Sequence, residues 1–274
     1  MTQQAFIDVE GARIHYCVDG LSSVPRRGED LAPVLVFSNS LGTDLAMWDP
    51  QVAALASRFR IVRYDNRGHG ASSIAPEATP GEYSIELLAN DALAVLDHLG
   101  LQRVGFCGIS MGGAVGMWLA LHVPKRVHKL ALCCTAAQLG TAEVWNARID
   151  TVRKNGMQAV AEAALQRWFT PPFHQREPAA VDRVRKMLLA TSPEGYAACC
   201  AAVRDVDFRD AISRVHAPTL VISGAKDASI PPPYGRFLAE RIGGAKFVEL
   251  DAAHLANIEA APRFTEEISR FFAS

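Results

Sequence analysis

The sequence predicts an α/β fold in which a mostly parallel, doubly wound sheet carries a helical insertion. Short, continuous apolar segments recur along the chain, as is typical of strands that are buried on both faces of a parallel sheet. Helical patterns separate most of these segments, and such alternation is typical of βαβ units. One long segment, residues 136–212, has helical periodicity and no expected strand.

The strands are expected to begin with a hairpin. Residues 5–20 alternate in polarity on both sides of Gly11, which is typical of two strands joined by a turn. The other expected strands are residues 33–38, 59–65, 103–108, 127–134, 218–224 and 245–250. The helices expected between and after them are residues 46–57, 84–99, 110–122, 233–242 and 262–272, with Ser84 at the start of the second.

The change of pattern after the expected strand 127–134 divides the chain into two expected domains. Residues 1–135 and 213–274 are expected to form the α/β core. Residues 136–212 are expected to form a helical cap over the sheet. Within this cap, the prolines and glycine of 169–178 and 191–196 are expected to interrupt the helices.

Composition narrows the classes of ligand. The 274 residues carry a formal net charge of -1, so the chain lacks the basic field that attracts nucleic acid or an anionic membrane. No apolar run reaches the roughly 18 residues of a membrane span, and the N-terminus has no signal-peptide pattern. We therefore expect a cytoplasmic protein that binds small molecules.

The six cysteines predict neither a metal site nor disulfides. No C-x-x-C or histidine-spaced cluster occurs, and four of the cysteines form two adjacent pairs. We expect buried, reduced thiols, and no metal or organic cofactor.

A serine lies between two glycines where an expected strand meets an expected helix. Residues 108–112 read Gly-Ile-Ser-Met-Gly and fit the G-x-S-x-G pattern, in which a strained turn exposes a nucleophilic hydroxyl. The N-terminus of the following helix offers free amide donors to developing negative charge. The pattern predicts that Ser110 is a nucleophile.

A serine nucleophile needs a base, and the base needs a carboxylate that fixes its tautomer. Among eight histidines, His254 alone lies in a loop between an expected strand and the final helix. Asp227 follows the expected strand 218–224, and Asp251 is a weaker alternative. The order Ser110, Asp227, His254 is the order that this nucleophile turn requires.

Two backbone amides are expected to form an oxyanion hole. The amide of Met111 follows the nucleophile, and the amide of Leu41 lies in the loop after the expected strand 33–38. In many hydrolases that loop carries His-Gly, whereas this chain has Asn39 and Ser40 at the equivalent positions.

These motifs together resemble the 3-oxoadipate enol-lactonases of the α/β-hydrolase superfamily. The superfamily pattern is carried by RYDNRGHGAS (63–72), GISMGG (108–113), SGAKDASIPP (223–232) and AAHLANIE (252–259). The narrower family pattern is carried by SNSLGTDLAMWDPQV (38–52), VWNARIDTV (144–152), RWFTPPF (167–173) and TSPEGYAACCAAVRDVD (191–207). The Asn39-Ser40 pair is itself typical of that family.

The resemblance implies hydrolysis of 3-oxoadipate enol-lactone to 3-oxoadipate, in the β-ketoadipate route of aromatic degradation. That substrate carries a carboxylate, which is costly to bury unpaired, so a cation is expected in the pocket. Arg148, Arg167 and Arg204 all lie in the expected cap. Trp145 and Arg148 are three residues apart and would share a helix face, so they are the preferred substrate-binding pair.

Two alternatives stay open at this point. Another serine hydrolase of the same fold, such as a general esterase, a perhydrolase or a carbon–carbon bond hydrolase, would share the same triad. A ligand receptor built on a hydrolase scaffold could also retain it. Dehalogenases and epoxide hydrolases of this fold are disfavoured because they carry Asp where this chain has Ser110. The oligomeric state is not indicated by the sequence.

Overall fold

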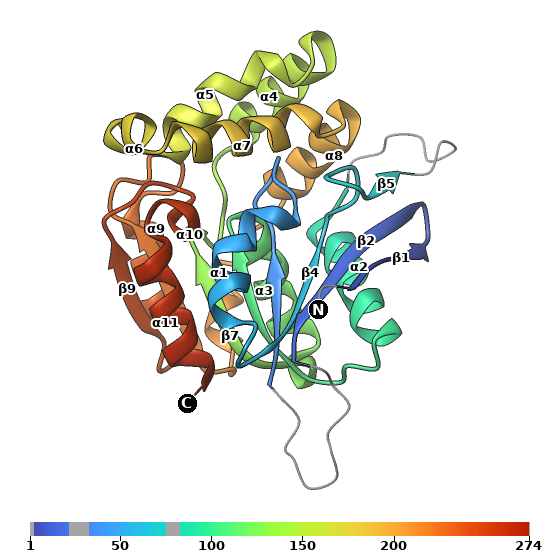
Figure 1. Cartoon of the computed structure of the whole chain (residues 1–274), viewed down its shortest axis with the longest axis vertical. Helices are drawn as coiled ribbons and strands as arrows, with labels where there is room; N and C mark the ends of the chain where they lie inside the picture. Colours follow the sequence, from blue (N-terminus) through green and yellow to red (C-terminus); the bar gives the residue numbers. More distant parts are fainter. Residues whose placement is uncertain (1–2, 22–32, 75–82, 274) are drawn as a thin grey trace, which may run out of the picture.

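The computed structural model describes residues 3–21, 33–74 and 83–273, and Figure 1 shows a sheet covered by helices on both faces. The nine-stranded sheet has the order β1-β2-β4-β3-β6-β7-β8-β9, and β5 pairs with β2. The strands are β1 (Gln3–Val9), β2 (Ala12–Gly20), β3 (Val34–Ser38), β4 (Arg60–Tyr64), β5 (Ser73–Ile74), β6 (Val104–Ile109), β7 (Val127–Cys133), β8 (Thr219–Gly224) and β9 (Lys246–Leu250).

The parallel part of the sheet runs from β4 through β3, β6, β7 and β8 to β9. All six residues of β6 are buried, as expected for a strand at the centre of a covered sheet. β1 and β2 form the expected antiparallel hairpin, and Gly11 at its turn has φ 68°. The prediction of a mostly parallel, doubly wound α/β fold is confirmed.

The helices are interleaved with the strands in the expected order. Those of the sheet region are α1 (Asp49–Leu55), α2 (Ile85–His98), α3 (Met111–His122), α9 (Pro232–Arg241), α10 (Ala256–Glu259) and α11 (Ala261–Ala273), with the 3-10 turns η1 (Leu45–Trp48), η2 (Pro124–Arg126) and η3 (Ile212–Arg214). α1 packs beside α11 and α2 beside α3, on opposite faces of the sheet (Figure 1). Ser84 caps α2 as expected, since its hydroxyl accepts the Leu87 N–H at 3.1 Å.

Five helices lie between β7 and β8 in the sequence and together across one end of the sheet (Figure 1). They are α4 (Ala142–Asn155), α5 (Gln158–Trp168), α6 (Pro171–Arg176), α7 (Pro178–Ala190) and α8 (Pro193–Arg204). The segment also contains an isolated antiparallel bridge between Gln138 and Asp207, close to its two ends. The division of the chain into core and cap domains stays a prediction.

The helices break within both expected interruptions, at residues 169–170, 177 and 191–192, but the breaks are shorter than the stretches expected from the sequence. Residues 171–176 form α6, and α8 begins at Pro193, so both proline-rich stretches start helices. Proline is tolerated in the first helical turn because the N–H it lacks has no partner there in any case. Thr170 and Ser192 accept backbone N–H groups at the two starts, as N-caps do.

Close contacts fix the helical segment against the sheet region. Gly68, in the loop after β4, lies against Gly195 of α8, and a Cβ on either residue would come within 2.6 Å of the other's Cα. The Ser192 N–H also donates to the Gly68 carbonyl at 3.1 Å. Two small residues thus allow the backbones to meet above the carboxyl end of β4.

All six cysteines are buried and unpaired, which confirms the expected reduced thiols: Cys17, Cys107, Cys133, Cys134, Cys199 and Cys200. Burial raises the pKa of the Cys17 thiol to about 11. Within the described ranges no helix has the length and apolarity to cross a membrane. The same residues contain no group of three or more His, Cys, Asp and Glu side chains placed to hold a metal ion.

Candidate active site

Ser110 occupies the turn between β6 and α3. Its backbone has φ 55° and ψ -116°, a left-handed conformation that is strained for a residue with a Cβ. A Cβ on Gly108 would lie 2.1 Å from the Gly112 carbonyl oxygen, and one on Gly112 would lie 2.3 Å from the Ser38 carbonyl oxygen. Both glycines of the G-x-S-x-G pattern are therefore needed for the helix to start this close to the sheet.

The neighbouring strand holds this strained turn in place. The Ser110 N–H donates to the Cys133 carbonyl of β7 at 2.9 Å. The Thr135 hydroxyl donates to the Ser110 carbonyl at 2.8 Å. With both backbone groups bonded, the turn presents the Ser110 side chain to the space above the sheet.

Asp227 and His254 form a buried hydrogen-bonded pair. Asp227 Oδ2 lies 2.8 Å from His254 Nδ1, and the two residues are 3% and 2% exposed. The other carboxylate oxygen accepts the N–H groups of Ser229 and Ile230, each at 2.8 Å. These bonds precede α9, so Asp227 orders its own loop and does not cap that helix.

The loops that carry these two residues are joined by their backbones. The Lys226 N–H donates to the Ala252 carbonyl at 2.9 Å, and the Ala225 N–H donates to the Leu250 carbonyl at 2.7 Å. A Cβ on Gly224 would lie 2.2 Å from the Ala253 carbonyl oxygen. The close approach of the loops after β8 and β9 brings the aspartate within hydrogen-bond reach of the histidine ring.

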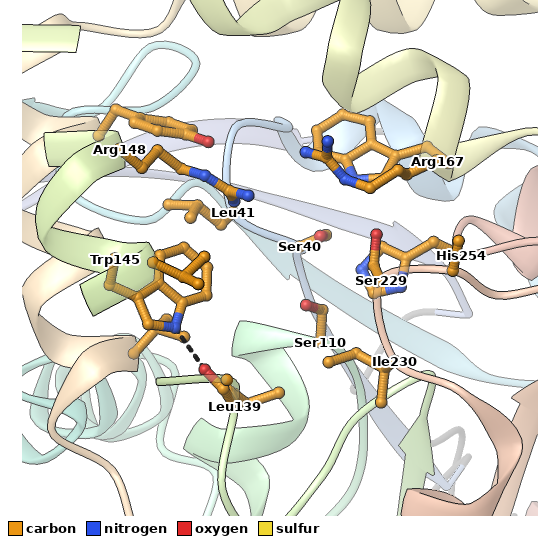
Figure 2. Close-up of a pocket in the computed structure, with 16 residues that line it drawn as sticks. Ser40, Leu41, Ser110, Leu139, Trp145, Arg148, Arg167, Ser229, Ile230 and His254 are labelled. Carbon is orange, nitrogen blue, oxygen red and sulfur yellow. Dashed lines mark hydrogen bonds between the residues drawn. The ribbon is translucent and has the colours of Figure 1, made fainter. Parts of the chain in front are cut away.

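Ser110 and His254 line one cavity of about 310 Å³ between the sheet and the helical segment. Figure 2 shows the Ser110 hydroxyl pointing into this cavity from below, with His254 at one side and Trp145 at the opposite side. No hydrogen bond joins Ser110 to His254 in the described part of the chain, and such contacts commonly shorten only when substrate binds. The arrangement can support attack by Ser110 on a carbonyl group.

The two expected oxyanion-hole residues lie beside the nucleophile. Met111 is the first residue of α3, where backbone N–H groups have no partner within the helix. Leu41 lines the cavity together with Ser40. Asn39 shapes this loop, because its amide donates to the Tyr64 carbonyl and its carbonyl accepts the Trp48 indole N–H, both at 2.9 Å.

Two arginines of the helical segment face the cavity from different helices. Arg148 of α4 and Arg167 of α5 both line it, and Figure 2 shows their guanidinium groups above Ser110. Neither has a carboxylate partner among the described residues. Burial, and next the charge of Arg148, lowers the pKa of Arg167. The cavity is therefore positively charged at its end opposite the nucleophile.

Aromatic side chains surround these cations. The Arg148 guanidinium lies over the Trp145 ring, 4.6 Å from its centroid, and the Trp145 indole N–H donates to the Leu139 carbonyl. Tyr196 is fully buried, which raises the pKa of its hydroxyl, while nearby Arg148 opposes that rise. Trp145 and Tyr196 thus form rigid walls that hold Arg148 toward the cavity.

Comparison with known proteins identifies the family. The protein-family model described as alpha/beta hydrolase fold matches residues 33–261 of this chain. 3-Oxoadipate enol-lactonase 2 of Acinetobacter baylyi is 42% identical over 88% of this chain and 89% of its own length. The enol-lactonase from Burkholderia xenovorans LB400 has a solved structure that is 45% identical, with a TM-score of 0.92 over 98% of this chain and 100% of that one. The chain belongs to the α/β-hydrolase family.

Within the α/β hydrolases, the chain groups with the 3-oxoadipate enol-lactonases, as the resemblance implied. A second relative from Acinetobacter baylyi, 3-oxoadipate enol-lactonase 1, is 37% identical over 92% of this chain and 93% of its own length. The identity of these relatives and the matching fold establish the chain as a hydrolase. The roles of individual residues stay predictions.

In this α/β hydrolase, two residues that the sequence offered as alternatives lie away from the cavity: Arg204 as the cation for the substrate carboxylate, and Asp251 as the carboxylate partner of His254. Arg204 donates to Asp205 and to the Asn146 side chain, each within 2.9 Å. Asp251 is exposed and forms an ion pair with Lys226 at 2.6 Å. Neither residue lines the cavity that contains Ser110 and His254.

Sequence reasoning did not select several residues that line the cavity of this hydrolase. Trp168 stacks on His254, with ring centroids 6.5 Å apart and an interplanar angle of 27°. Tyr196 lies in a stretch that was expected to interrupt helices, so nothing marked it as a wall. The missed or unselected lining residues include Ser40, Arg167, Trp168, Tyr196 and Ser229.

Proposed function

We propose that this hydrolase opens 3-oxoadipate enol-lactone to 3-oxoadipate, a step in the β-ketoadipate route of aromatic degradation. The observation that carries the proposal is a cavity with the Ser110 turn at one end and, at the other, the guanidinium groups of Arg148 and Arg167, which pair with no carboxylate of the residues that the structure describes. A small lactone with a carboxylate matches both ends. The relatives that are named enol-lactonases support the same substrate.

The proposed reaction begins with proton transfer from Ser110 to His254, whose tautomer Asp227 fixes through the 2.8 Å bond to Nδ1. The Ser110 oxygen forms a bond to the lactone carbonyl carbon, and the amides of Met111 and Leu41 stabilise the resulting oxyanion. The ring C–O bond then breaks, and His254 gives the proton it took from Ser110 to the leaving enolate oxygen, which leaves an acyl-enzyme, an enol and a neutral histidine. An enolate is a better leaving group than a simple alkoxide, so little acid assistance is needed.

The second half of the proposed reaction releases the acid. His254 removes a proton from water, which attacks the acyl carbon, and the acyl bond to Ser110 breaks as the serine regains its proton. The enol released by ring opening becomes the ketone of 3-oxoadipate by tautomerisation, in which the oxygen loses its proton and a carbon gains one. These steps use only side chains and backbone groups of this chain, without a metal or organic cofactor.

The two cavity arginines are proposed to bind the carboxylate that the substrate carries. An unpaired carboxylate is costly to bury, and so are two unpaired guanidinium groups. When the ligand enters, its carboxylate pairs with the guanidinium groups, and this pairing lowers the free-energy cost of burying each charge. A planar guanidinium group suits a carboxylate because it donates two parallel hydrogen bonds to it. Trp145 keeps Arg148 in position by stacking on it.

Loss of ultraviolet absorbance from freshly generated 3-oxoadipate enol-lactone tests the function directly. Wild type is compared with Ser110→Ala, and both are measured beside p-nitrophenyl acetate. Fast lactone turnover that the substitution abolishes, with slow ester cleavage, supports the proposal. Good ester cleavage without lactone turnover would instead favour a general esterase, and no turnover of either would favour a ligand receptor.

A further inference from the structure

The carboxylate of Glu259 joins two segments that are far apart in the sequence. Glu259 is the last residue of α10 and is half-buried. Its Oε2 accepts the Ala253 N–H at 2.8 Å. Its Oε1 accepts the Thr170 N–H at 3.2 Å and also the Thr170 hydroxyl. One side chain therefore holds the loop after β9 and the connection between α5 and α6.

Both segments carry residues that line the cavity. Ala253 immediately precedes His254, and Thr170 lies two residues after Trp168, whose ring stacks on the His254 ring. The Leu255 N–H donates to the Trp168 carbonyl at 3.2 Å, which adds a direct bond between the same segments. Arg167 precedes Trp168 and faces the cavity. The bonds of Glu259 thus lie directly behind the proposed base and one proposed carboxylate-binding residue.

An ionised carboxylate suits this position better than any neutral group. It accepts hydrogen bonds on both oxygens, and such charge-assisted bonds are about twice as strong as neutral ones. Glutamine would offer one acceptor oxygen, and its NH₂ group would face a donor on one of the two segments. Because Ala253 and Thr170 are buried, at 2% and 8% exposed, a donor left without a partner there is costly.

Space beside these bonds gives the segments room to move if the bonds are lost. A second cavity of about 350 Å³ is lined in part by Arg167, Thr170, Lys226, Ala228 and Ala253. Arg167 and Ala228 also line the first cavity, so the two cavities share part of their walls. Dense packing would hold a displaced loop near its place, but a cavity does not.

We propose that Glu259 is a positioning residue that fixes the His254 loop and the Arg167–Trp168 end of α5 relative to each other. Its loss displaces the histidine from Ser110 and the arginine from the substrate carboxylate. A displacement of about 1 Å in an active site lowers turnover by up to about 100-fold. The effect on Arg167 rests on the proposed function, whereas the effect on His254 holds for any substrate that Ser110 attacks.

The test compares Glu259→Gln with Thr170→Val and with Glu240→Gln, an exposed glutamate of α9 that serves as the control. Three quantities are measured: kcat and KM for the enol-lactone, kcat for p-nitrophenyl acetate, and the rate at which a fluorophosphonate labels Ser110. For Glu259→Gln we expect labelling and both kcat values to fall about 10-fold or more, and the lactone KM to rise several-fold. Thr170→Val removes the hydroxyl that donates to Glu259 and that caps α6, but it keeps the Thr170 N–H and the Ala253 N–H as donors to Glu259. For this variant we expect a rise in lactone KM with labelling within about 2-fold of wild type.

Labelling and kcat values for Glu259→Gln that equal those of Glu240→Gln, with only a lower Tm, would overturn the proposal. If Glu259→Gln does not fold, Glu259→Asp is measured in its place, because the shorter carboxylate keeps the charge and cannot reach both segments. Failure of the proposed function has a different signature. Wild type would then cleave the ester without opening the lactone, and the labelling rates would still decide the role of Glu259.

Discussion

His254 Nδ1 lies 2.8 Å from Asp227 Oδ2, while Asp227 Oδ1 accepts two backbone N–H groups of its own loop. The two oxygens of this carboxylate are therefore not equivalent. The N–H groups of Ser229 and Ile230 need a hydrogen-bond acceptor at the Oδ1 position, so whichever atom occupies the Oδ2 position faces the histidine. This asymmetry determines what happens when the carboxylate becomes an amide.

Asp227→Asn is expected to lower kcat by roughly 10³- to 10⁴-fold without unfolding the protein. The amide oxygen keeps the two loop N–H groups, so the NH₂ group faces His254 Nδ1 and forces the tautomer that is protonated on Nε2. That tautomer cannot accept the Ser110 proton. Turnover of the lactone and of p-nitrophenyl acetate, measured beside Tm, checks the prediction.

Asp251→Asn is the matched control for this prediction. Asp251 is three residues before His254, but it is exposed and pairs with Lys226. Because exposed ion pairs contribute little to stability, its variant is expected to retain wild-type kcat and Tm. A large loss of kcat in Asp251→Asn, together with an active Asp227→Asn, would mean that Asp251 and not Asp227 has the carboxylate role.

Arg148→Ala and Arg167→Ala are each expected to lower kcat/KM for the enol-lactone by roughly 10- to 100-fold, mainly through KM. A hydrogen bond to a charged group contributes about 1.5–3 kcal/mol, and each substitution removes one proposed partner of the substrate carboxylate. Cleavage of p-nitrophenyl acetate should change little, because that ester has no carboxylate. Steady-state kinetics on both substrates separate the two effects.

Arg153→Ala controls for loss of a positive charge from the same helical segment. Arg153 lies on α4 with Arg148, but it is exposed. Its substitution is expected to leave the lactone KM unchanged. Equal losses on the lactone and on the neutral ester in Arg148→Ala or Arg167→Ala would mean that these residues support the fold of the cavity and not the carboxylate.

The order of strands and helices along the chain could be predicted for the sheet region because the sequence signals for these elements are local. The glycines around Ser110 indicate a tight turn in which a helix starts in close contact with the sheet. The continuous apolar strands indicate a sheet that is covered on both faces. Asp227 and His254 follow strand ends, and the carboxyl ends of parallel strands meet at one edge of the sheet. Their 2.8 Å contact is therefore a consequence of topology that sequence position already indicates.

The helical segment was harder to predict because its signals depend on packing. Arg148 could be proposed from its spacing to Trp145, but no periodic pattern tells which helix face turns toward the sheet. Arg167 is therefore indistinguishable in sequence from an exposed arginine such as Arg153. Tyr196 was missed because the proline and glycine beside it indicated an interruption, whereas they form the first turn of α8.

His69 is expected to make the stability of the protein fall below pH 6.5. Its ring is fully buried, Nδ1 lies 3.2 Å from the Arg67 carbonyl oxygen, and Nε2 has no hydrogen-bond partner in the part of the chain that the structure describes. Burial lowers the pKa of His69 below its ordinary value of about 6.5. The folded protein therefore keeps this ring neutral at a pH where the unfolded chain protonates it.

Between pH 6.5 and the lower pKa of the folded state, the unfolded chain binds one more proton than the folded protein at this position. The free energy of unfolding consequently rises with pH across this window, by up to about 1.4 kcal/mol per pH unit, and the contribution is complete above pH 6.5. Urea unfolding of wild type and His69→Gln at pH 5, 6 and 7 measures it. The variant is expected to be less stable at pH 7 and to have a shallower dependence on pH, whereas His216→Gln, at an exposed position, should keep the wild-type slope. An unchanged slope in His69→Gln would show that another group is responsible for acid destabilisation.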